Sequence, residues 1–220
     1  MRGRSEMNAV SIARLLTKPK YSCIINADKK MLFLVKEVNM KLLIASDIHG
    51  DIESAKVLIE TFEREGCDKI LLLGDVLYHG PRNDLPGRYA PKEVITLLNG
   101  YKDKILAVRG NCDTEVDQMV LEFPILGDYA LLSLDGLSIY ATHGHNYNTK
   151  TPPPLSEGDI LLHGHTHVIR AEKFGNNNTY INPGSITLPK ENCPRSYAIY
   201  EARKFTFYNV LGEVVKTVEF

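Results

Sequence analysis

One stretch decides how this chain is read: Leu161-Leu162-His163-Gly164-His165-Thr166-His167. It begins with the aliphatic residues of a buried strand and ends in a cluster of imidazoles. In an extended segment alternate side chains lie on one side, so we expect the rings of His165 and His167 to point the same way. Two neutral imidazoles aimed at one point indicate a pair of metal ligands. On this stretch alone, a half-buried strand whose histidines bond to the backbone is an equal alternative.

The same layout, an aliphatic run that ends in ligand-type residues, recurs along the chain. All seven histidines lie between positions 49 and 167. The other runs and their polar ends are 41–46 into Asp47-Ile48-His49-Gly50, 69–73 into Gly74-Asp75, 104–108 into Arg109-Gly110-Asn111-Cys112-Asp113, and 137–142 into His143-Gly144-His145. Open α/β sheets build their sites at the carboxyl ends of strands, and we therefore interpret these ends as parts of one site.

The composition is that of an ordinary globular protein. The chain has 220 residues, of which 44% are hydrophobic and 24% are charged, enough for one sizeable core. A net charge of -1 provides no basic field for nucleic acid or membranes, and no apolar stretch approaches the ~20 residues of a membrane span. The four cysteines show no CxxC pairing or disulfide framework, which predicts free thiols and a cytoplasmic protein without a membrane partner.

Residues 1–39 differ from the remainder of the chain. They carry a net charge of +5, against -6 for the rest, and no ligand-type residue that joins the pattern. Met40 opens an aliphatic run that would be a natural first strand. We therefore predict an N-terminal extension over 1–39, poorly ordered or an upstream start, followed by one functional domain over 40–220. A targeting leader is the alternative for the first segment.

Hydrophobic spacing predicts alternating strands and helices in the first half. Apolar residues within 52–62 recur at helical spacing and predict a helix. Asp51 is its expected N-cap, and Gly66 is expected to end it. Residues 90–98 form a second predicted helix, opened by Pro91. With strands before, between and after these helices, the pattern is βαβαβ. Such crossovers predict parallel pairing.

The second half, after about residue 112, is predicted to be mostly antiparallel β-structure. Asp135-Gly136 indicates a hairpin between 129–134 and 137–142. Further strands are predicted at 159–162, 168–173, 179–181, 196–201, 204–209 and 214–220. The fold class that satisfies both halves is α/β, a two-sheet β-sandwich flanked by helices.

The candidate metal ligands are Asp47, His49, Asp75, Asn111, His143, His165 and His167. Two carboxylates, four imidazoles and one amide are more ligands than one ion needs. Mixed nitrogen and oxygen sets suit manganese, iron or zinc better than calcium or magnesium and do not select among them. A shared carboxylate commonly holds two ions ~3.5–4 Å apart, and Asp75 has the chemistry and the central position for that bridge.

Five blocks of this sequence, in order, resemble the calcineurin-like metallophosphoesterase superfamily: Asp47-Ile48-His49, Gly74-Asp75, Gly110-Asn111, His143-Gly144-His145 and Gly164-His165-Thr166-His167. Any single block is a weak signal, whereas five in order, each after an apolar run, are a strong one. The resemblance covers residues 40 to about 200. Within the superfamily, segments 74–83 and 109–113 look most similar to the small bacterial YfcE-type phosphodiesterases.

The resemblance implies a dinuclear metal-dependent phosphodiesterase with a two-sheet sandwich fold. Asp47, His49 and His167 would hold one divalent ion and Asn111, His143 and His165 the second, with Asp75 bridging. A hydroxide between the ions would attack phosphorus in line with the leaving group. Manganese is the first expectation for both ions, with iron, zinc or nickel as alternatives, and the expected partner is a small phosphodiester substrate.

Cys112 departs from the superfamily pattern, which usually has His after Gly-Asn as a general acid or phosphate contact. A thiol with a reference pKa of ~8.5 is a poor replacement for imidazolium. We therefore expect activated leaving groups, with low pKa values, to be favoured.

The other predicted site residues are less specific. Asp75, Asn111, Cys112 and His145 are predicted as catalytic residues, with His145 beside the hydroxide. Contact with phosphate is predicted for His79, Arg82 and Arg109. The alternative for His79 and Arg82 is a place in a solvated loop, and the alternative for Arg109 is a structural ion pair. His163 alternates off the ligand face and is predicted to pack.

Three rival functions remain at this point: a phosphomonoesterase or a nuclease with the same site, and a non-catalytic protein-binding scaffold of the same fold. The missing basic field argues against long nucleic acid, which is bound largely through Lys and Arg. The presence of all seven ligand-type residues argues against a scaffold. A β edge at the C-terminus could serve a homo-oligomer.

Overall fold

The computed structural model describes residues 21–26, 31–36 and 40–220. The chain divides into two units between Asn39 and Met40. The first unit contains an antiparallel hairpin of β1 (Tyr21–Asn26) and β2 (Met31–Lys36). The expectation of a poorly ordered or upstream extension concerns many residues that lie outside the described ranges, and it stays a prediction.

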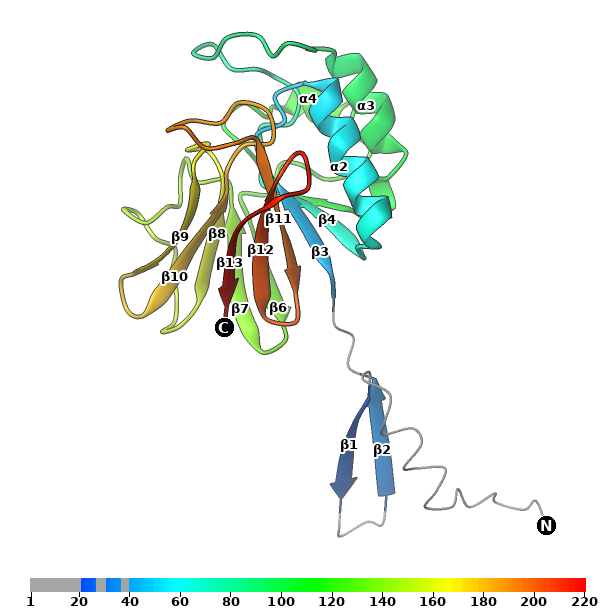
Figure 1. The fold of residues 1–220 in the computed structure, drawn as a ribbon, viewed down its shortest axis with the longest axis vertical. Helices are drawn as coiled ribbons and strands as arrows, with labels where there is room; N and C mark the ends of the chain where they lie inside the picture. The colour runs from blue at the N-terminus through cyan, green and yellow to red at the C-terminus, as the bar shows by residue number, and fades with distance from the viewer. Residues whose placement is uncertain (1–20, 27–30, 37–39) are drawn as a thin grey trace, which may run out of the picture. The chain divides into compact units, whose positions relative to one another are not determined.

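The second unit is built from two β-sheets that face each other, with helices on the outer side of one of them (Figure 1). The six-stranded sheet has the order β13-β12-β11-β3-β4-β5. Its strands are β3 (Leu42–Ala45), β4 (Lys69–Leu72), β5 (Ile105–Ala107), β11 (Ser196–Glu201), β12 (Lys204–Asn209) and β13 (Val214–Glu219). This arrangement confirms the predicted two-sheet sandwich.

The five-stranded sheet has the order β6-β7-β8-β10-β9. Its strands are β6 (Tyr129–Leu134), β7 (Leu137–Thr142), β8 (Ile160–His163), β9 (Ile169–Phe174) and β10 (Asn178–Pro183). The prediction of mainly antiparallel pairing is wrong for its centre, where β7 and β10 both run parallel to β8. The long connection between β7 and β8 allows this crossover. As a result, β7 and β8 deliver their carboxyl ends to the same edge.

The helices pack on the parallel part of the six-stranded sheet. Strands β3, β4 and β5 pair in parallel and are linked through α2 (Ile52–Glu65), then through α3 (Pro91–Asn99) and the 3-10 turn η1 (Lys102–Lys104). A short helix, α4 (Glu115–Gln118), follows β5. The backbone N–H of Ser54 donates to the Asp51 carboxylate at 2.7 Å, and Gly66 ends α2 with φ 61°. Both predicted helix limits are confirmed.

The core has two layers, one on each face of the six-stranded sheet. Alternate residues of β3 enter different layers: Leu43 and Ala45 pack with the helices, whereas Leu42 and Ile44 pack with the five-stranded sheet. A strand covered on both faces must be apolar at every position. This requirement explains the uninterrupted aliphatic runs of the sequence.

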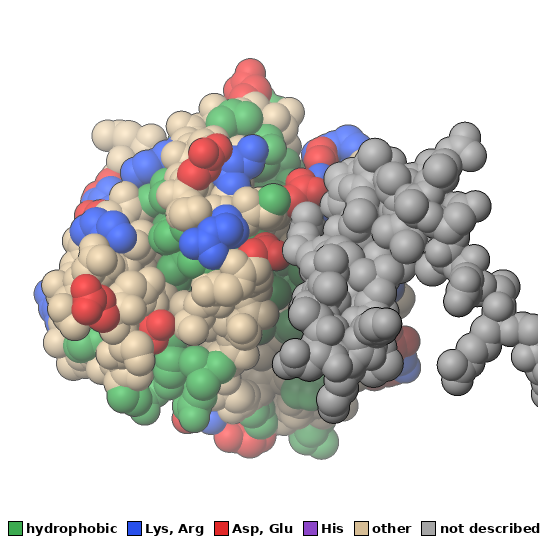
Figure 2. Space-filling model, turned by 90° about the horizontal axis from the view of Figure 1, so that it is seen from below, with side chains coloured by type: hydrophobic (Ala, Val, Ile, Leu, Met, Phe, Trp, Pro, Cys, Tyr) green, Lys and Arg blue, Asp and Glu red, His purple; other side chains and the backbone are tan. Residues whose placement is uncertain are grey.

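The two ends of the sandwich differ in chemistry. Figure 2 looks onto the end that carries the β6–β7 turn, where Lys, Arg, Asp and Glu are scattered and no histidine colour appears among the coloured side chains. Strand β13 is an edge strand with mostly exposed residues. Self-association through this edge stays a prediction. Within the described ranges, no helix has both the length and the apolar character needed to cross a bilayer.

Candidate metal centre

Five loops meet at the carboxyl ends of β3, β4, β5, β7 and β8. Because these ends lie at one edge of the sandwich, residues far apart in the chain come together. The structure collects all seven predicted ligands there: Asp47, His49, Asp75, Asn111, His143, His165 and His167.

The first group consists of Asp47, His49 and His167, all buried. Nε2 of His167 lies 3.2 Å and Nε2 of His49 lies 3.6 Å from Oδ1 of Asp47. The two Nε2 atoms are 3.3 Å apart. Oδ1 of Asp47 is buried without a hydrogen-bond partner among the described residues. Two ring nitrogens and one buried carboxylate oxygen that face one another fit a divalent ion.

The backbone orients the histidine rings toward this centre. Three Nδ1 atoms lie within hydrogen-bond distance of backbone carbonyls: His49 to Tyr78 at 2.8 Å, His143 to Leu73 at 2.6 Å, and His167 to Leu188 at 2.5 Å. A carbonyl oxygen only accepts, so the ring proton lies on Nδ1. Each Nε2 therefore presents a lone pair to the centre, as metal-binding histidines do.

The second group consists of Asn111, His143 and His165. Nε2 of His143 lies 3.1 Å from Oδ1 of Asn111 and 3.1 Å from Nδ1 of His165. Asp75 lies between the groups, with Oδ2 3.8 Å from Nε2 of His49 and 3.6 Å from Nε2 of His143. One carboxylate oxygen thus faces a ring from each group.

The expectation of an extended His165–His167 segment is wrong. Strand β8 ends at His163, and both His165 and His167 adopt left-handed conformations, with φ 65° and 61°. Gly164, between the strand and this turn, packs so closely that a Cβ there would lie 1.8 Å from Oγ of Ser46. The turn sends the two rings to different groups of the centre.

Burial and neighbouring charges set the protonation of the centre. Burial alone would raise the pKa of Asp47, but the adjacent rings of His167 and His49 hold its pKa well below the ordinary range. Burial, with a contribution from His143, lowers the pKa of His165 to about 4 and also lowers the pKa of His145. Both rings are therefore neutral at neutral pH, the form that binds metal ions.

Asp113, whose role the sequence left open, braces two of the loops. Its carboxylate accepts hydrogen bonds from the backbone N–H of Gly110 at 2.7 Å, Asp75 at 2.8 Å and Val76 at 2.9 Å. The backbone N–H of Cys112 donates to Oδ1 of Asp75 at 2.8 Å. These bonds tie the loop after β4 to the loop after β5 and hold the Asp75 carboxylate in place.

The Cys112 side chain lies directly beside the centre. Its Sγ, a ring nitrogen of His49 and a carboxylate oxygen of Asp75 all lie within 4.8 Å of one another. Burial, followed by the charge of Asp75, raises the pKa of Cys112. The side chain is therefore a neutral thiol at neutral pH.

A cavity of about 390 Å³, the central pocket, opens over Asp75, Arg82, Asn111, Cys112, His165 and Lys190. Arg82 and Lys190 have no ion-pair partner among the described residues, so both are available to an anion. Sequence reasoning missed Lys190 because a single lysine in the connection between β10 and β11 carries no motif.

Two predicted phosphate contacts lie outside the central pocket. The His79 ring packs between Tyr78 and Tyr89, with centroid distances of 4.7 and 5.4 Å. The Arg109 guanidinium lies 3.5 Å from the Glu115 carboxylate. Each side chain thus has a local contact of its own, and neither lines the central pocket.

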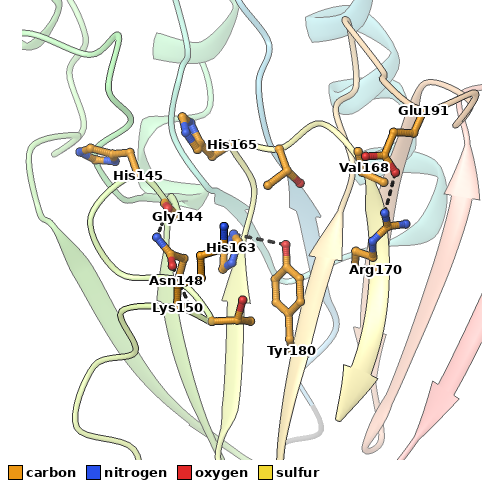
Figure 3. Close-up of a pocket in the computed structure, with 12 residues that line it drawn as sticks. Gly144, His145, Asn148, Lys150, His163, His165, Val168, Arg170, Tyr180 and Glu191 are labelled. Carbon is orange, nitrogen blue, oxygen red and sulfur yellow. Dashed lines mark hydrogen bonds and ion pairs between the residues drawn. The ribbon is translucent and has the colours of Figure 1, made fainter. Parts of the chain in front are cut away.

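The remaining histidines border a second cavity (Figure 3). His145 lies beside the second group, with its ring centroid 5.4 Å from that of His143 and 6.3 Å from that of His165. His163 is buried and stacks on Tyr180 at 4.3 Å, which confirms its predicted packing role.

Two mixed sheets with this donor set at their common edge define a metal-dependent phosphoesterase. The chain belongs to the calcineurin-like phosphoesterase superfamily, because the family model for that domain matches residues 40–204. The family and fold predicted from the five blocks are thereby confirmed.

Two known proteins illustrate the relationship. The chain is 44% identical over 162 residues to phosphodiesterase YfcE of Escherichia coli K12, a match that covers 74% of this chain and 88% of YfcE. The solved structure of YfcE matches this structure with a TM-score of 0.79 at 40% identity. The match covers 82% of this chain and 99% of the YfcE chain. Vps29 of Entamoeba histolytica, solved with zinc, has a TM-score of 0.50 at 18% identity, covers 82% of this chain and 99% of that one, and shows the fold alone.

Proposed function

We propose that this protein is a dinuclear metal-dependent phosphodiesterase of the cytoplasm that hydrolyses small phosphodiesters, with manganese as its first metal. The observation that carries the proposal is the position of Asp75. A single carboxylate oxygen faces His49 of one ligand group and His143 of the other. A shared carboxylate of this kind is how proteins hold two ions close together.

Each part of the centre has a distinct task. Asp47, His49 and His167 would hold one ion, and Asn111, His143 and His165 the other. When bound, two divalent ions lower the pKa of water and neutralise negative charge on phosphoryl oxygens. Asp113 keeps the bridging carboxylate in position through its backbone hydrogen bonds.

The substrate side of the centre suits a monoanionic diester. Arg82 and Lys190 place positive charge along the central pocket, and the neutral His145 ring beside the second group is able to accept a proton. The neutral thiol of Cys112 is a weak acid, so leaving groups that need no protonation are favoured. The 44% identity to a protein named phosphodiesterase supports the diester over the monoester.

The test compares bis(4-nitrophenyl) phosphate with 4-nitrophenyl phosphate. The protein is stripped with a chelator and reloaded with manganese, iron(II), zinc or nickel, beside Asp75→Asn. Asp103→Asn is the matched control, because Asp103 is an exposed aspartate in η1. We expect diester turnover that returns with manganese, is lost in Asp75→Asn and is kept in Asp103→Asn.

Other outcomes point to the rival functions. Turnover of the monoester alone would establish a phosphomonoesterase. Absence of turnover with every metal, in a protein whose circular dichroism shows a folded chain, would reject the enzyme and favour a protein-binding scaffold.

A further inference from the structure

A second cavity lies beside the centre, on the five-stranded sheet. This lateral pocket, of about 350 Å³, is defined by His145, Lys150, His163, Arg170, Tyr180 and Glu191. The central and lateral pockets share His165 and Thr166 in their walls. They therefore meet at His165, one of the residues of the second ligand group.

The lateral pocket is lined by groups that donate hydrogen bonds and groups that accept them. Figure 3 shows Asn148 and Lys150 on one side and Arg170 with Glu191 on the other. A nitrogen of the Arg170 guanidinium donates to the Glu191 carboxylate at 2.6 Å, so this pair is neutral overall. Within the described ranges, the Lys150 ammonium has no ion-pair partner and is available to a ligand.

The tyrosine ring of the lateral pocket is covered by its neighbours. Tyr180, its tyrosine, is only 5% exposed and lies with its ring against His163. Val168 is also buried. Nε2 of His163 is buried without a partner among the described residues. Donors and acceptors on the facing walls of the pocket suit hydroxyl groups, which both donate and accept.

We propose that the lateral pocket binds the alcohol group that stays on phosphorus, and that this group is a hydroxylated aliphatic unit such as a glycerol or a sugar. The inference rests on the proposed function. A phosphodiester carries two alcohol groups on one phosphorus, and two pockets that meet at His165 provide one place for each. Hydrolysis breaks the P–O bond of one alcohol, which leaves with a proton from water, while water oxygen joins phosphorus and the other alcohol remains in the product monoester.

The test varies only the retained alcohol. Glyceryl 4-nitrophenyl phosphate and n-propyl 4-nitrophenyl phosphate share a leaving group and a three-carbon chain, and differ in two hydroxyls. We expect the manganese-loaded full chain to favour the glyceryl ester in kcat/KM by about tenfold, since each satisfied hydrogen bond contributes a few-fold. Rates without enzyme are subtracted, because the glyceryl ester also cyclises by itself.

Substitutions in each pocket test where the preference for the glyceryl ester arises. Lys150→Met removes a donor from the lateral pocket, and we expect it to reduce the preference to about threefold or less while the n-propyl ester keeps its kcat/KM within about twofold. Arg170→Met, on the opposite wall, provides an independent repeat. Lys190→Met is the matched substitution in the central pocket. We expect it to lower kcat/KM for both esters by the same factor.

The outcomes separate this inference from the proposed function. Equal turnover of both esters by the unmodified chain would overturn the inference and leave a phosphodiesterase. A tenfold preference that survives in Lys150→Met and Arg170→Met would also overturn it, because the hydroxyls would then bind elsewhere. Failure to turn over either ester, or bis(4-nitrophenyl) phosphate, would reject the phosphodiesterase and this inference together.

Discussion

At the scale of single residues, we propose that the side chain at position 112 limits which alcohols leave. The Cys112 thiol is buried, and its raised pKa keeps it neutral. An imidazole in its place would carry a transferable proton near neutral pH. We predict that Cys112→His raises kcat/KM at least about tenfold for diesters with poor leaving groups, as general acids contribute.

The measurement is kcat/KM across diesters whose leaving alcohols span a range of pKa values. Protonation of the leaving group flattens the dependence of rate on that pKa. The half-buried Cys193 supplies the control, since Cys193→His adds the same ring away from the centre. An unchanged slope in Cys112→His would contradict a role for this position in leaving-group protonation.

Gly110 is the residue that leaves room for the Asp75 carboxylate. A Cβ at Gly110 would lie 2.1 Å from Oδ1 and 2.3 Å from the backbone nitrogen of Asp75. We predict that Gly110→Ala displaces this carboxylate, abolishes manganese binding measured by calorimetry, and destabilises the fold by about 1–3 kcal/mol. Gly87→Ala is the control, because a Cβ there meets no atom within 4 Å. Normal manganese affinity in Gly110→Ala would contradict this prediction, because the loop would then accommodate the methyl group without displacing the Asp75 carboxylate.

At the scale of elements, the start of α2 secures the loop that carries Asp47 and His49. The Asp51 carboxylate accepts from the backbone N–H of Ser54 at 2.7 Å, from its hydroxyl at 2.8 Å, and from the backbone N–H of Arg88 at 3.2 Å. Asp51 therefore caps the helix and also ties it to the loop that precedes α3.

We predict that Asp51→Ala lowers the free energy of unfolding by about 1–2 kcal/mol, the usual loss of an N-cap. Urea unfolding followed by circular dichroism measures it. Glu53→Ala removes an exposed carboxylate from the first turn of the same helix and should change the free energy by no more than about 0.5 kcal/mol. Equal effects of the two substitutions would mean that charge at the helix start, and not the cap, is responsible.

At the scale of the whole molecule, we expect metal binding and folding to be coupled. The ligands come from loops of both sheets, so the centre exists only in the folded chain. We predict that a chelator lowers the melting temperature by about 5–10 °C relative to manganese at about 100 times its Kd. Scanning calorimetry gives this value without an activity assay. In Asp75→Asn the melting temperature should respond little to manganese, and a full response there would contradict the bridging role.

Stability at high pH depends on a thiol far from the centre. Burial raises the pKa of Cys67 from 9.0 to about 11. The folded chain holds this proton more tightly than the unfolded chain, so its contribution is complete below pH 9 and is lost as pH rises through 11. We predict a loss of up to about 2 kcal/mol over that window. Urea unfolding at several pH values should show a smaller loss in Cys67→Ala, with Cys193→Ala as the thiol control; an equal loss in Cys67→Ala would assign the effect to other groups.

Local patterns allowed much of this molecule to be predicted from its sequence. The limits of α2 follow from Asp51 and Gly66, because capping depends on the nearest backbone groups. Runs such as 41–46 are apolar at every position since both faces of their sheet are covered. The ligand types follow each run directly, so the donor set and its chemistry were readable before any fold was known.

Only the tertiary structure decided which of these side chains meet and what surrounds them. The left-handed turns at His165 and His167 send one ring toward His143 and the other toward Asp47. Arg109 turns to Glu115, whereas Lys190 enters the central pocket from the connection after β10. The lateral pocket joins loops and strands distant in sequence. Such neighbours depend on how two sheets pack, and local hydrophobic periodicity carries no information about contacts between distant loops.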